Sequence, residues 1–280
     1  MNPTDGVAKA GRRSPLRGRS RGSVFLCYHS VTEDGPPYLS IKPATLQAQL
    51  RILVERGYRS GGRRDLDLLA GGGGAGSRIA FLTFDDGFRD TVTAALPLLR
   101  EHGFTGMAFL LAGHLESGAP LDWPEVAGEA SRRPRLMRSV DWPMVEQLAE
   151  AGWDIGSHGI SHARMTSLSD EELTQELLDS RRLLAQRLGG CDLLAYPFGA
   201  WDERVARLAA AAGYAYAFSL PFGEQLEATR LSIPRVMVDD RDASWRFRAK
   251  LTPLGRSALF SPVRPAVRRL LRHRPHSHAD

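Results

Sequence analysis

The chain has 280 residues, of which 42% are hydrophobic and 25% are charged, and its net charge at pH 7 is +5. A chain of this size and composition can form one large domain, or two small ones, with a substantial hydrophobic core. No run approaches the roughly 20 apolar residues that cross a bilayer, so no transmembrane helix is expected. Two cysteines, Cys27 and Cys191, are too few for a disulfide framework.

The positive charge lies mainly at the two ends of the chain. We therefore expect a basic, disordered tail at 1–22, a folded domain at 23–248 and a second basic tail at 249–280. Such tails could contact an anionic membrane surface, whereas nothing beyond charge points to nucleic acid, so no nucleic-acid partner is expected. The first tail has no apolar segment before Val24, which argues against a secretory signal and favours a cytoplasmic location.

Short apolar runs alternate with longer amphipathic segments from Val24 onward. The apolar runs predict strands at 24–29, 79–84, 106–112, 153–158, 193–197, 214–219 and 232–238. The spacing of apolar residues predicts helices at 45–58, 93–104, 144–153 and 170–188. The last of these helices is preceded by Ser169, with Glu172 three residues on, which is the capping-box pattern. Alternating strands and helices predict an α/β fold with parallel strands, either a barrel or a doubly wound sheet.

Residues suited to catalysis fall where predicted strands end. His29 ends the first run, Asp85 and Asp86 follow the second, and His158 ends the fourth. Because parallel strands bring their carboxyl ends to one edge, we expect these side chains to lie close together. Two adjacent carboxylates beside a buried strand repel each other, so a positive partner is expected near them.

The segment GSHGISH offers a partner, because it places His158 and His162 four residues apart after a strand. Such a pair alone is a weak signal, but together with the Asp-Asp pair it is much stronger. Two imidazoles and one carboxylate suit a divalent metal, zinc by default, with Co²⁺, Ni²⁺ or Mn²⁺ as alternatives. One of Asp85 and Asp86 would then bind the ion, and the other would remain free as a base.

Three motifs, TFDDG, SHGISH and AYPFG, resemble in order and separation those of the polysaccharide deacetylases, the NodB-type domains of carbohydrate esterase family four. The resemblance covers about residues 23 to 240 and implies a distorted (β/α) barrel of about seven parallel strands. It also implies a metal-dependent removal of acetyl groups from N-acetylated sugars. Matched position by position, it makes Asp85 the general base and Asp86, His158 and His162 the metal ligands.

The sequence departs from the commonest pattern of this family in three places. Ala195 stands where an arginine is frequent, Gly159 stands where Ser or Thr is usual, and no Leu-x-His supplies a general acid near the end of the domain. The segment FLCYHSV resembles the Tyr-His signature of a subgroup that acts on poly-N-acetylglucosamine-like polymers, in which an early histidine is the acid. That resemblance makes His29 the expected acid, and a backbone-bonded structural histidine is the alternative.

Five further residues have expected roles at the site. The turn around Tyr196 and Phe198 suits oxyanion or substrate contacts, with the backbone N–H of Phe198 pointing into the cleft. Arg235 is expected to approach the carboxylates in place of the arginine missing at position 195. His102 and His114 are the next candidates for the acid.

The sequence therefore predicts a hydrolase that acts on non-peptide C–N bonds and removes N-acetyl groups from a polysaccharide or lipid-linked sugar. A hydrolase of a small cyclic amide or ureide, and a catalytically silent carbohydrate-binding barrel, remain alternatives. Three tryptophans, Trp123, Trp142 and Trp201, could stack on sugar rings or pack in the domain. The particular sugar and the oligomeric state stay open.

Overall fold

The computed structural model describes residues 22–74, 76–116, 118–220, 229–242 and 244–252. All but one residue of the tail expected at 1–22, and nearly all of the one at 249–280, therefore lie outside the described residues. The strands are β1 Val24–Tyr28, β2 Ser30–Val31, β3 Ser40–Ile41, β4 Arg59–Ser60, β5 Ile79–Phe84, β6 Met107–Leu110, β7 Asp154–Ser157, β8 Leu193–Ala195, β9 Tyr216–Ser219, β10 Ile233–Pro234 and β11 Val236–Met237. All seven predicted strands are present, most of them one to three residues shorter.

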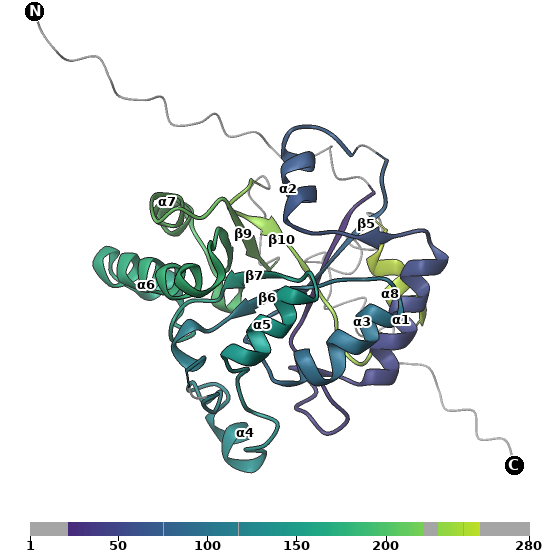
Figure 1. The fold of residues 1–280 in the computed structure, drawn as a ribbon, viewed down its shortest axis with the longest axis horizontal. Coiled ribbons are helices and arrows are strands. Elements are labelled where there is room, and N and C mark those ends of the chain that lie inside the picture. The colour runs from purple at the N-terminus through teal and green to yellow at the C-terminus, as the bar shows by residue number, and fades with distance from the viewer. Residues whose placement is uncertain (1–21, 75, 117, 221–228, 243, 253–280) are drawn as a thin grey trace, which may run out of the picture.

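The main sheet is parallel and nearly closes into a barrel, as predicted. Its order is β10-β9-β8-β7-β6-β5-β1-β11, with β4 paired to β5, and helices surround it (Figure 1). The predicted strand 232–238 is divided at Arg235 into two halves with different neighbours: β10 pairs with β9, and β11 pairs with β1. This divided strand links the two edges of the sheet and puts Arg235 at the junction.

The helices are α1 Pro43–Glu55, α2 Arg63–Ala70, the π-helix η1 Thr91–Ala95, α3 Leu96–Glu101, the 3-10 helix η2 Ala112–His114, α4 Ala127–Arg132, α5 Trp142–Glu150, the 3-10 helix η3 Met165–Ser167, α6 Asp170–Leu188, the 3-10 helix η4 Pro197–Gly199, α7 Glu203–Ala211 and α8 Ser244–Lys250. Helix α6 confirms its prediction: Ser169 and Glu172 form the capping box. Within the described residues, none of the helices combines the length and hydrophobicity needed to cross a membrane.

One helix begins earlier than predicted, and the last helix extends past the expected end of the domain. The predicted helix 93–104 begins earlier, as the π-helical turn η1, in which the N–H of Leu96 donates to the carbonyl of Thr91. Pro97 has no N–H for the regular α-helical bond at this point. At the other end, α8 extends past residue 248 and Leu251 is buried, so the folded domain reaches beyond its predicted boundary.

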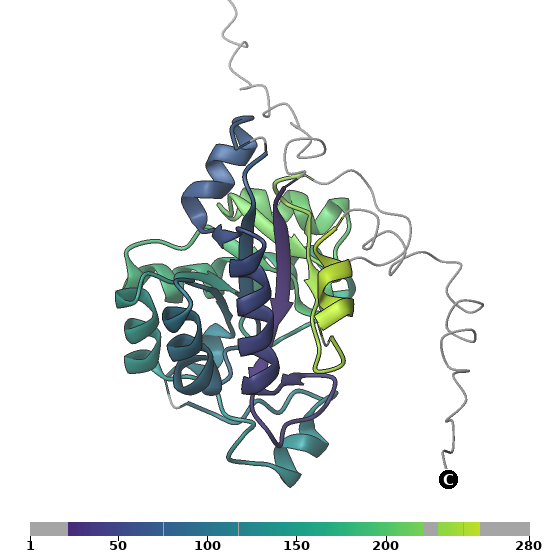
Figure 2. The same ribbon diagram turned by 90° about the vertical axis from the view of Figure 1, so that its right-hand side faces the viewer.

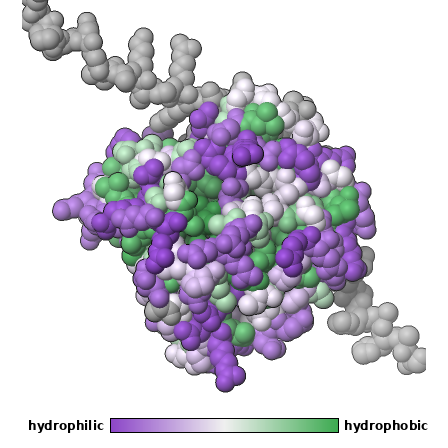
Figure 3. All heavy atoms as spheres, viewed as in Figure 1, coloured by the Kyte–Doolittle hydropathy of each residue, from purple (hydrophilic) through white to green (hydrophobic). Residues whose placement is uncertain are grey.

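Both faces of the central strands are buried, which explains their continuous apolar sequences. On β5, Phe81 packs with Phe109 and Phe218 in the barrel interior, while Leu82 and Phe84 belong to the larger cluster beneath the helices. Helix α2 contributes Leu66 and Leu69 to the interior cluster. Figure 2 shows α1 lying along β1, and Figure 3 shows a face that is largely hydrophilic with scattered hydrophobic side chains.

Candidate active site and metal centre

The turn that follows β5 has a strained backbone. Asp86 adopts a φ of 69°, a left-handed conformation that is costly for a residue with a Cβ, and Gly87 follows at 74°. The turn is held on both sides, because the N–H of Asp85 donates to Tyr28 O at 3.0 Å and Val140 N–H donates to Gly87 O at 2.8 Å. This conformation directs two consecutive carboxylates to the same edge of the sheet.

Asp86, His158 and His162 converge on one point. Each histidine Nε2 lies 3.3 Å from Asp86 Oδ1, and all three side chains are at least 93% buried. Asp86 Oδ1 has no hydrogen bond of regular geometry in the described structure, although it is buried. Bonds of about 2.0–2.2 Å in a tetrahedral arrangement would separate neighbouring N and O ligand atoms by about 3.4 Å. The three residues therefore fit a zinc-like divalent ion.

The surroundings of the two histidines fix their ring orientations. His158 Nδ1 lies 2.8 Å from the carbonyl oxygen of Ala195, so it donates there and leaves the lone pair of Nε2 directed at Asp86. His162, at a φ of 61°, lies between Trp123 and Phe198, with ring centroids 4.1 and 4.5 Å away. A carbonyl partner for the second nitrogen is typical of metal-binding histidines.

Gly159 follows His158 because its position does not accommodate a side chain. Its φ is 88°, and a Cβ would lie 2.8 Å from Glu176 Oε1. The same oxygen accepts the N–H groups of Ile160 and Ser161 at 2.8 and 2.9 Å. Glu176 thus organises the turn between the two histidines, and this explains the departure from the usual Ser or Thr.

The electrostatics of the three residues favour cation binding. Burial would raise the pKa of Asp86, but its contacts with His158 and His162 outweigh burial and hold this pKa well below its usual value. Burial lowers the pKa of His162, and this effect exceeds the opposing effect of Asp86, which raises it. For His158, burial also lowers the pKa, but Asp85 and Asp86 outweigh burial and raise it. The site therefore combines an ionised carboxylate with two imidazoles that compete for it.

Asp85 forms a buried ion pair with Arg235. The guanidinium Nη1 and Nη2 donate to Oδ1 and Oδ2 of Asp85 at 2.6 and 2.7 Å, and Nη1 also donates to Thr83 Oγ1 at 2.9 Å. Burial would raise the pKa of Asp85, but the charge of Arg235 holds it below its usual value. Arg235 is 1% exposed and is engaged by these partners, so it holds Asp85 instead of facing a substrate.

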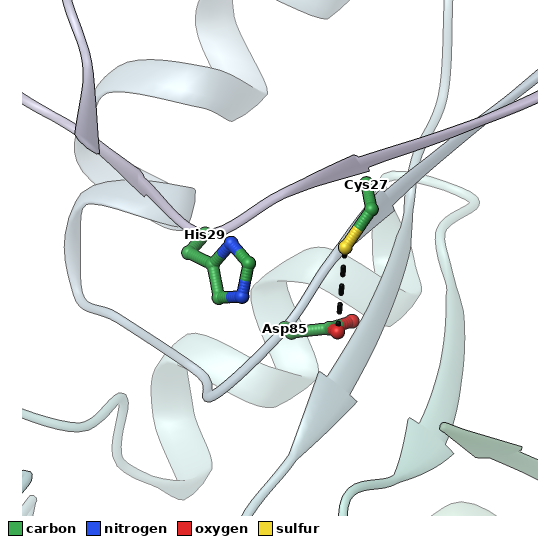
Figure 4. Close-up of side chains that lie close together, drawn as sticks. All are labelled: Cys27, His29 and Asp85. Atoms are coloured by element: carbon green, nitrogen blue, oxygen red, sulfur yellow. Dashed lines mark hydrogen bonds between the residues drawn. The ribbon is translucent and has the colours of Figure 1, made fainter. Parts of the chain in front are cut away.

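The side chains of His29 and Cys27 lie close to Asp85, as Figure 4 shows. One ligand atom from each of Cys27, His29 and Asp85 lies within 4.8 Å of the others. The thiol of Cys27 donates to Asp85 Oδ2 at 3.5 Å, and burial raises the pKa of this thiol well above its usual value. Because Arg235 already occupies both oxygens of Asp85, its charge opposes a second cation here.

The side chains of the turn 196–199 pack against neighbouring residues. Tyr196 is completely buried and its hydroxyl donates to Leu231 O at 2.9 Å, so its side chain is structural. Phe198 has a φ of 59° and packs on His162, with the guanidinium of Arg164 4.3 Å from its ring centroid. Of the three tryptophans considered for sugar stacking, the remaining two pack within the domain. Trp142 is 6% exposed and donates to Glu116 Oε1, and the ring of Trp201 stacks near that of Tyr196.

The two further candidates for the general acid, His102 and His114, lie at different ends of the barrel. His102 follows α3, and its Nδ1 lies 2.9 Å from Leu98 O, close to the amino end of the next strand. His114 ends η2 after β6, at the carboxyl edge. Three residues near the site, Cys27, Thr83 and Asp90, were not predicted from the sequence to lie there. Cys27 and Thr83 are paired neighbours on β1 and β5, a register that the sequence alone does not reveal.

Comparisons with known proteins agree with this geometry. Residues 72–217 match the family model described as polysaccharide deacetylase. The putative polysaccharide deacetylase YxkH of Bacillus subtilis is 22% identical over 192 residues, 68% of this chain and 61% of that protein. The peptidoglycan-N-acetylglucosamine deacetylase of Bacillus cereus is 27% identical over 138 residues, 49% of this chain and 54% of that protein.

Among solved structures, the Streptococcus pyogenes deacetylase PplD in complex with acetate has a similar fold. The TM-score is 0.67 at 19% identity, covering 82% of this chain and 98% of that one. This chain spans only about three fifths of YxkH and about half of the Bacillus cereus enzyme. Since the family model covers 146 of the 280 residues, more than half of the sequence, the chain belongs to the polysaccharide deacetylase family.

Proposed function

We propose that this protein is a metal-dependent hydrolase that removes acetyl groups from N-acetylated sugars of a polysaccharide or glycan precursor. The observation that carries the proposal is the convergence of Asp86, His158 and His162 beside the arginine-paired Asp85. A barrel that only bound carbohydrate would have no need of a buried triad with an orphan carboxylate oxygen.

The residues that would hold the ion are Asp86, His158 and His162, with zinc as the default and Co²⁺, Ni²⁺ or Mn²⁺ as alternatives. When bound, such an ion polarises the acetyl carbonyl and lowers the pKa of a bound water toward neutrality. The chain's own contribution is to fix both imidazoles, through Ala195 O for His158 and through Trp123 and Phe198 for His162.

Asp85 is the proposed general base. Its carboxylate remains ionised because Arg235 outweighs the cost of burial, so it can accept a proton from the attacking water. Arg235 also prevents the carboxylate from rotating, because it binds both oxygens. The base is therefore held in position before the substrate arrives.

His29 is the proposed general acid, and it donates a proton to the departing sugar nitrogen. An amide nitrogen is a poor leaving group unless it is protonated, and imidazole is suited to this transfer near neutral pH. The backbone N–H of Phe198 is the proposed donor to the oxyanion, since the turn that carries it lies beside His162.

The proposed substrate contains N-acetylglucosamine or a similar amino sugar. Support comes from the name of the Bacillus cereus relative, a peptidoglycan-N-acetylglucosamine deacetylase. A lipid-linked sugar precursor is the corresponding substrate for a cytoplasmic enzyme, and the basic tails would then bring the protein to an anionic membrane surface.

Acetate release tests the proposal. The full chain, with and without added zinc, would be incubated with N-acetylglucosamine oligomers, peptidoglycan fragments and lipid-linked N-acetylated sugars. We expect zinc-dependent release from at least one class, and none from a matched protein carrying both His158→Ala and His162→Ala. Zinc-independent release, or equal release by the double variant, would contradict the proposed metal centre. A complete lack of release from all three classes would contradict the proposed activity.

A further inference from the structure

Asp90 joins the turn that carries Asp85 to the segment that carries His29. Its Oδ2 accepts a hydrogen bond from Ser30 Oγ at 2.5 Å, and its Oδ1 accepts one from the backbone N–H of Val31 at 2.8 Å. Ser30 and Val31 immediately follow His29 and are 2% and 1% exposed. Both oxygens of one carboxylate are thus used on the two residues next to the proposed acid.

The opposite side of the same turn is also held in place. Arg89 N–H donates to Arg138 O at 3.0 Å, and Phe88 forms an isolated β-bridge with Ser139. Asp90 directly precedes η1, a π-helical turn that packs against β2. Such π-helical turns are frequent at functional sites. Asp90 is therefore a fixed point from which its carboxylate can position another segment.

His29 depends on its neighbours for its position. It lies between β1 and β2 and belongs to neither strand. On its amino side, Tyr28 O accepts the N–H of Asp85, and on its carboxyl side Asp90 holds Ser30 and Val31. The segment that carries the proposed acid is therefore attached at two points to the turn that carries the proposed base.

We infer that Asp90 is a positioning residue that fixes His29 relative to Asp85, so that the acid and the base can act on one substrate. This inference rests on the proposed function. A displacement of about 1 Å in a catalytic group can cost about 10²-fold in rate, so loss of two hydrogen bonds next to His29 should be measurable. Asp90 itself need not touch the substrate.

The kinetic test compares an N-acetyl sugar with its O-acetyl analogue. Asp90→Ala should lower kcat on the amide by about 10- to 100-fold and on the ester by less than about 3-fold, because the amide depends more on the acid. Ser30→Ala, which removes one of the two bonds, should show a smaller loss with the same selectivity. Asp90→Asn can keep both bonds, with its amide N–H donating to Ser30 Oγ, and should stay within about 3-fold of the wild type.

Asp154 provides a matched control at the amino end of β7. Like Asp90, it is partly buried, and its carboxylate accepts a backbone N–H, that of Arg63, at 2.7 Å. Asp154→Ala should leave the amide-to-ester ratio unchanged. In a His29→Ala background, Asp90→Ala should cause less than about 2-fold further loss, because the two residues act through one imidazole.

A second readout does not require turnover. In the full chain labelled with ¹⁵N-histidine, the imidazole signals of His29 would be assigned by their disappearance in His29→Ala. These signals should move in Asp90→Ala and remain in place in Asp90→Asn and Asp154→Ala. The His102 signals provide an internal reference.

The outcomes separate the inference from the proposed function. Equal losses on amide and ester in Asp90→Ala, a full additional loss in the His29→Ala background, or unmoved His29 signals would each overturn the role of Asp90. A wild type without acetate release, or a His29→Ala protein with a wild-type amide rate, would contradict the proposed activity or acid. In those two cases the His29 signals still decide whether Asp90 positions the histidine.

Discussion

The two ends of the barrel differ in the backbone conformation of their residues and in the partners of their polar side chains. In the described part of the chain, three residues other than glycine have positive φ angles, and all three, Asp86, His162 and Phe198, lie at the carboxyl end around the candidate metal centre. Asp86 Oδ1 and His162 Nδ1 are buried there without hydrogen-bond partners. Each such backbone conformation costs on the order of 1–3 kcal/mol.

At the amino end, the charges are paired and the pairs are structural. Arg63 binds Asp192 through Nε and Nη2, at 2.7 to 3.1 Å, and its guanidinium lies 4.6 Å from the ring centroid of Tyr216. Its backbone N–H is accepted by Asp154. The comparison shows that, among the described residues, the strained residues other than glycine lie at the end where the motifs converge, whereas the ion pairs of Arg63 link elements at the other end.

The largest expected effect follows from removing the metal ligands. Combining His158→Ala with His162→Ala should reduce zinc content from about one equivalent to background and reduce acetate release by about 10³-fold or more, because several kcal/mol of transition-state stabilisation is lost. Elemental analysis and rate measurements check this. Equal metal content in the variant and the wild type would contradict the site, and loss of metal in Arg63→Met would contradict the division between the two ends.

The next effect separates the two adjacent aspartates. Asp85→Asn should retain zinc and lose about 10²-fold or more in rate, because general-base assistance is removed. Asp86→Asn should lose zinc affinity as well as rate, since its Oδ1 is the atom that faces both histidines. Isothermal titration with zinc and rate measurements on the same preparations distinguish the roles. If Asp85→Asn loses metal while Asp86→Asn retains it, the two assignments are reversed.

Much of this arrangement could be predicted because its determinants are local in the sequence. The strand runs, the capping box of α6 and the spacing of TFDDG and SHGISH each depend on a few consecutive residues. Because parallel strands share a carboxyl edge, the sequence also predicted that the residues ending these strands lie close together. The catalytic and ligand roles given to these residues remain predictions until variants are measured.

The missed features depend on contacts distant in sequence. Arg235 was expected to approach the carboxylates, but its bidentate contact with Asp85, 150 residues away, requires that the last strand be divided at this arginine, and no periodicity shows that division. Similarly, the contact of Asp90 with Ser30 spans 60 residues. The side chain of Tyr196, expected near the substrate, turned out to be buried because it reaches Leu231. Burial and register of this kind emerge only from the complete fold.

Unfolding measurements can compare one arginine ion pair at each end of the barrel, that of Arg235 and that of Arg63. Arg235→Met should lower the free energy of unfolding by about 3–5 kcal/mol, because it leaves the buried carboxylate of Asp85 without its partner. Arg63→Met should cost only about 1 kcal/mol, since its partners Asp67 and Asp192 are at least a third exposed. Urea unfolding at pH 7 checks both values. Equal losses would show that the two ion pairs are equivalent and that the comparison fails.

The smallest expected effect concerns two partly buried carboxylates, one at each end, whose pKa values are raised. Burial raises the pKa of Asp90 from 3.8 to about 6, against the opposing hydrogen bonds from Ser30 and Val31, and burial also raises the pKa of Asp154. Between pH 4 and 6 the folded protein therefore binds protons that the unfolded chain has released. The resulting stability is present below about pH 4 and is lost as the pH rises through 6.

Asp90→Asn removes this dependence because its side chain stays neutral. The rise in pKa corresponds to at most about 3 kcal/mol, and because the Asp90 side chain is partly exposed, solvent screening reduces it to about 1–2 kcal/mol. The variant should match the wild type at pH 4 and exceed it by that amount at pH 7, whereas the lowered pKa values of Asp85 and Asp86 place their titration below this window. Unfolding in urea at both pH values checks the difference. A variant less stable than the wild type at pH 7 would show that the charge of Asp90 stabilises the link to His29 more than its burial opposes it.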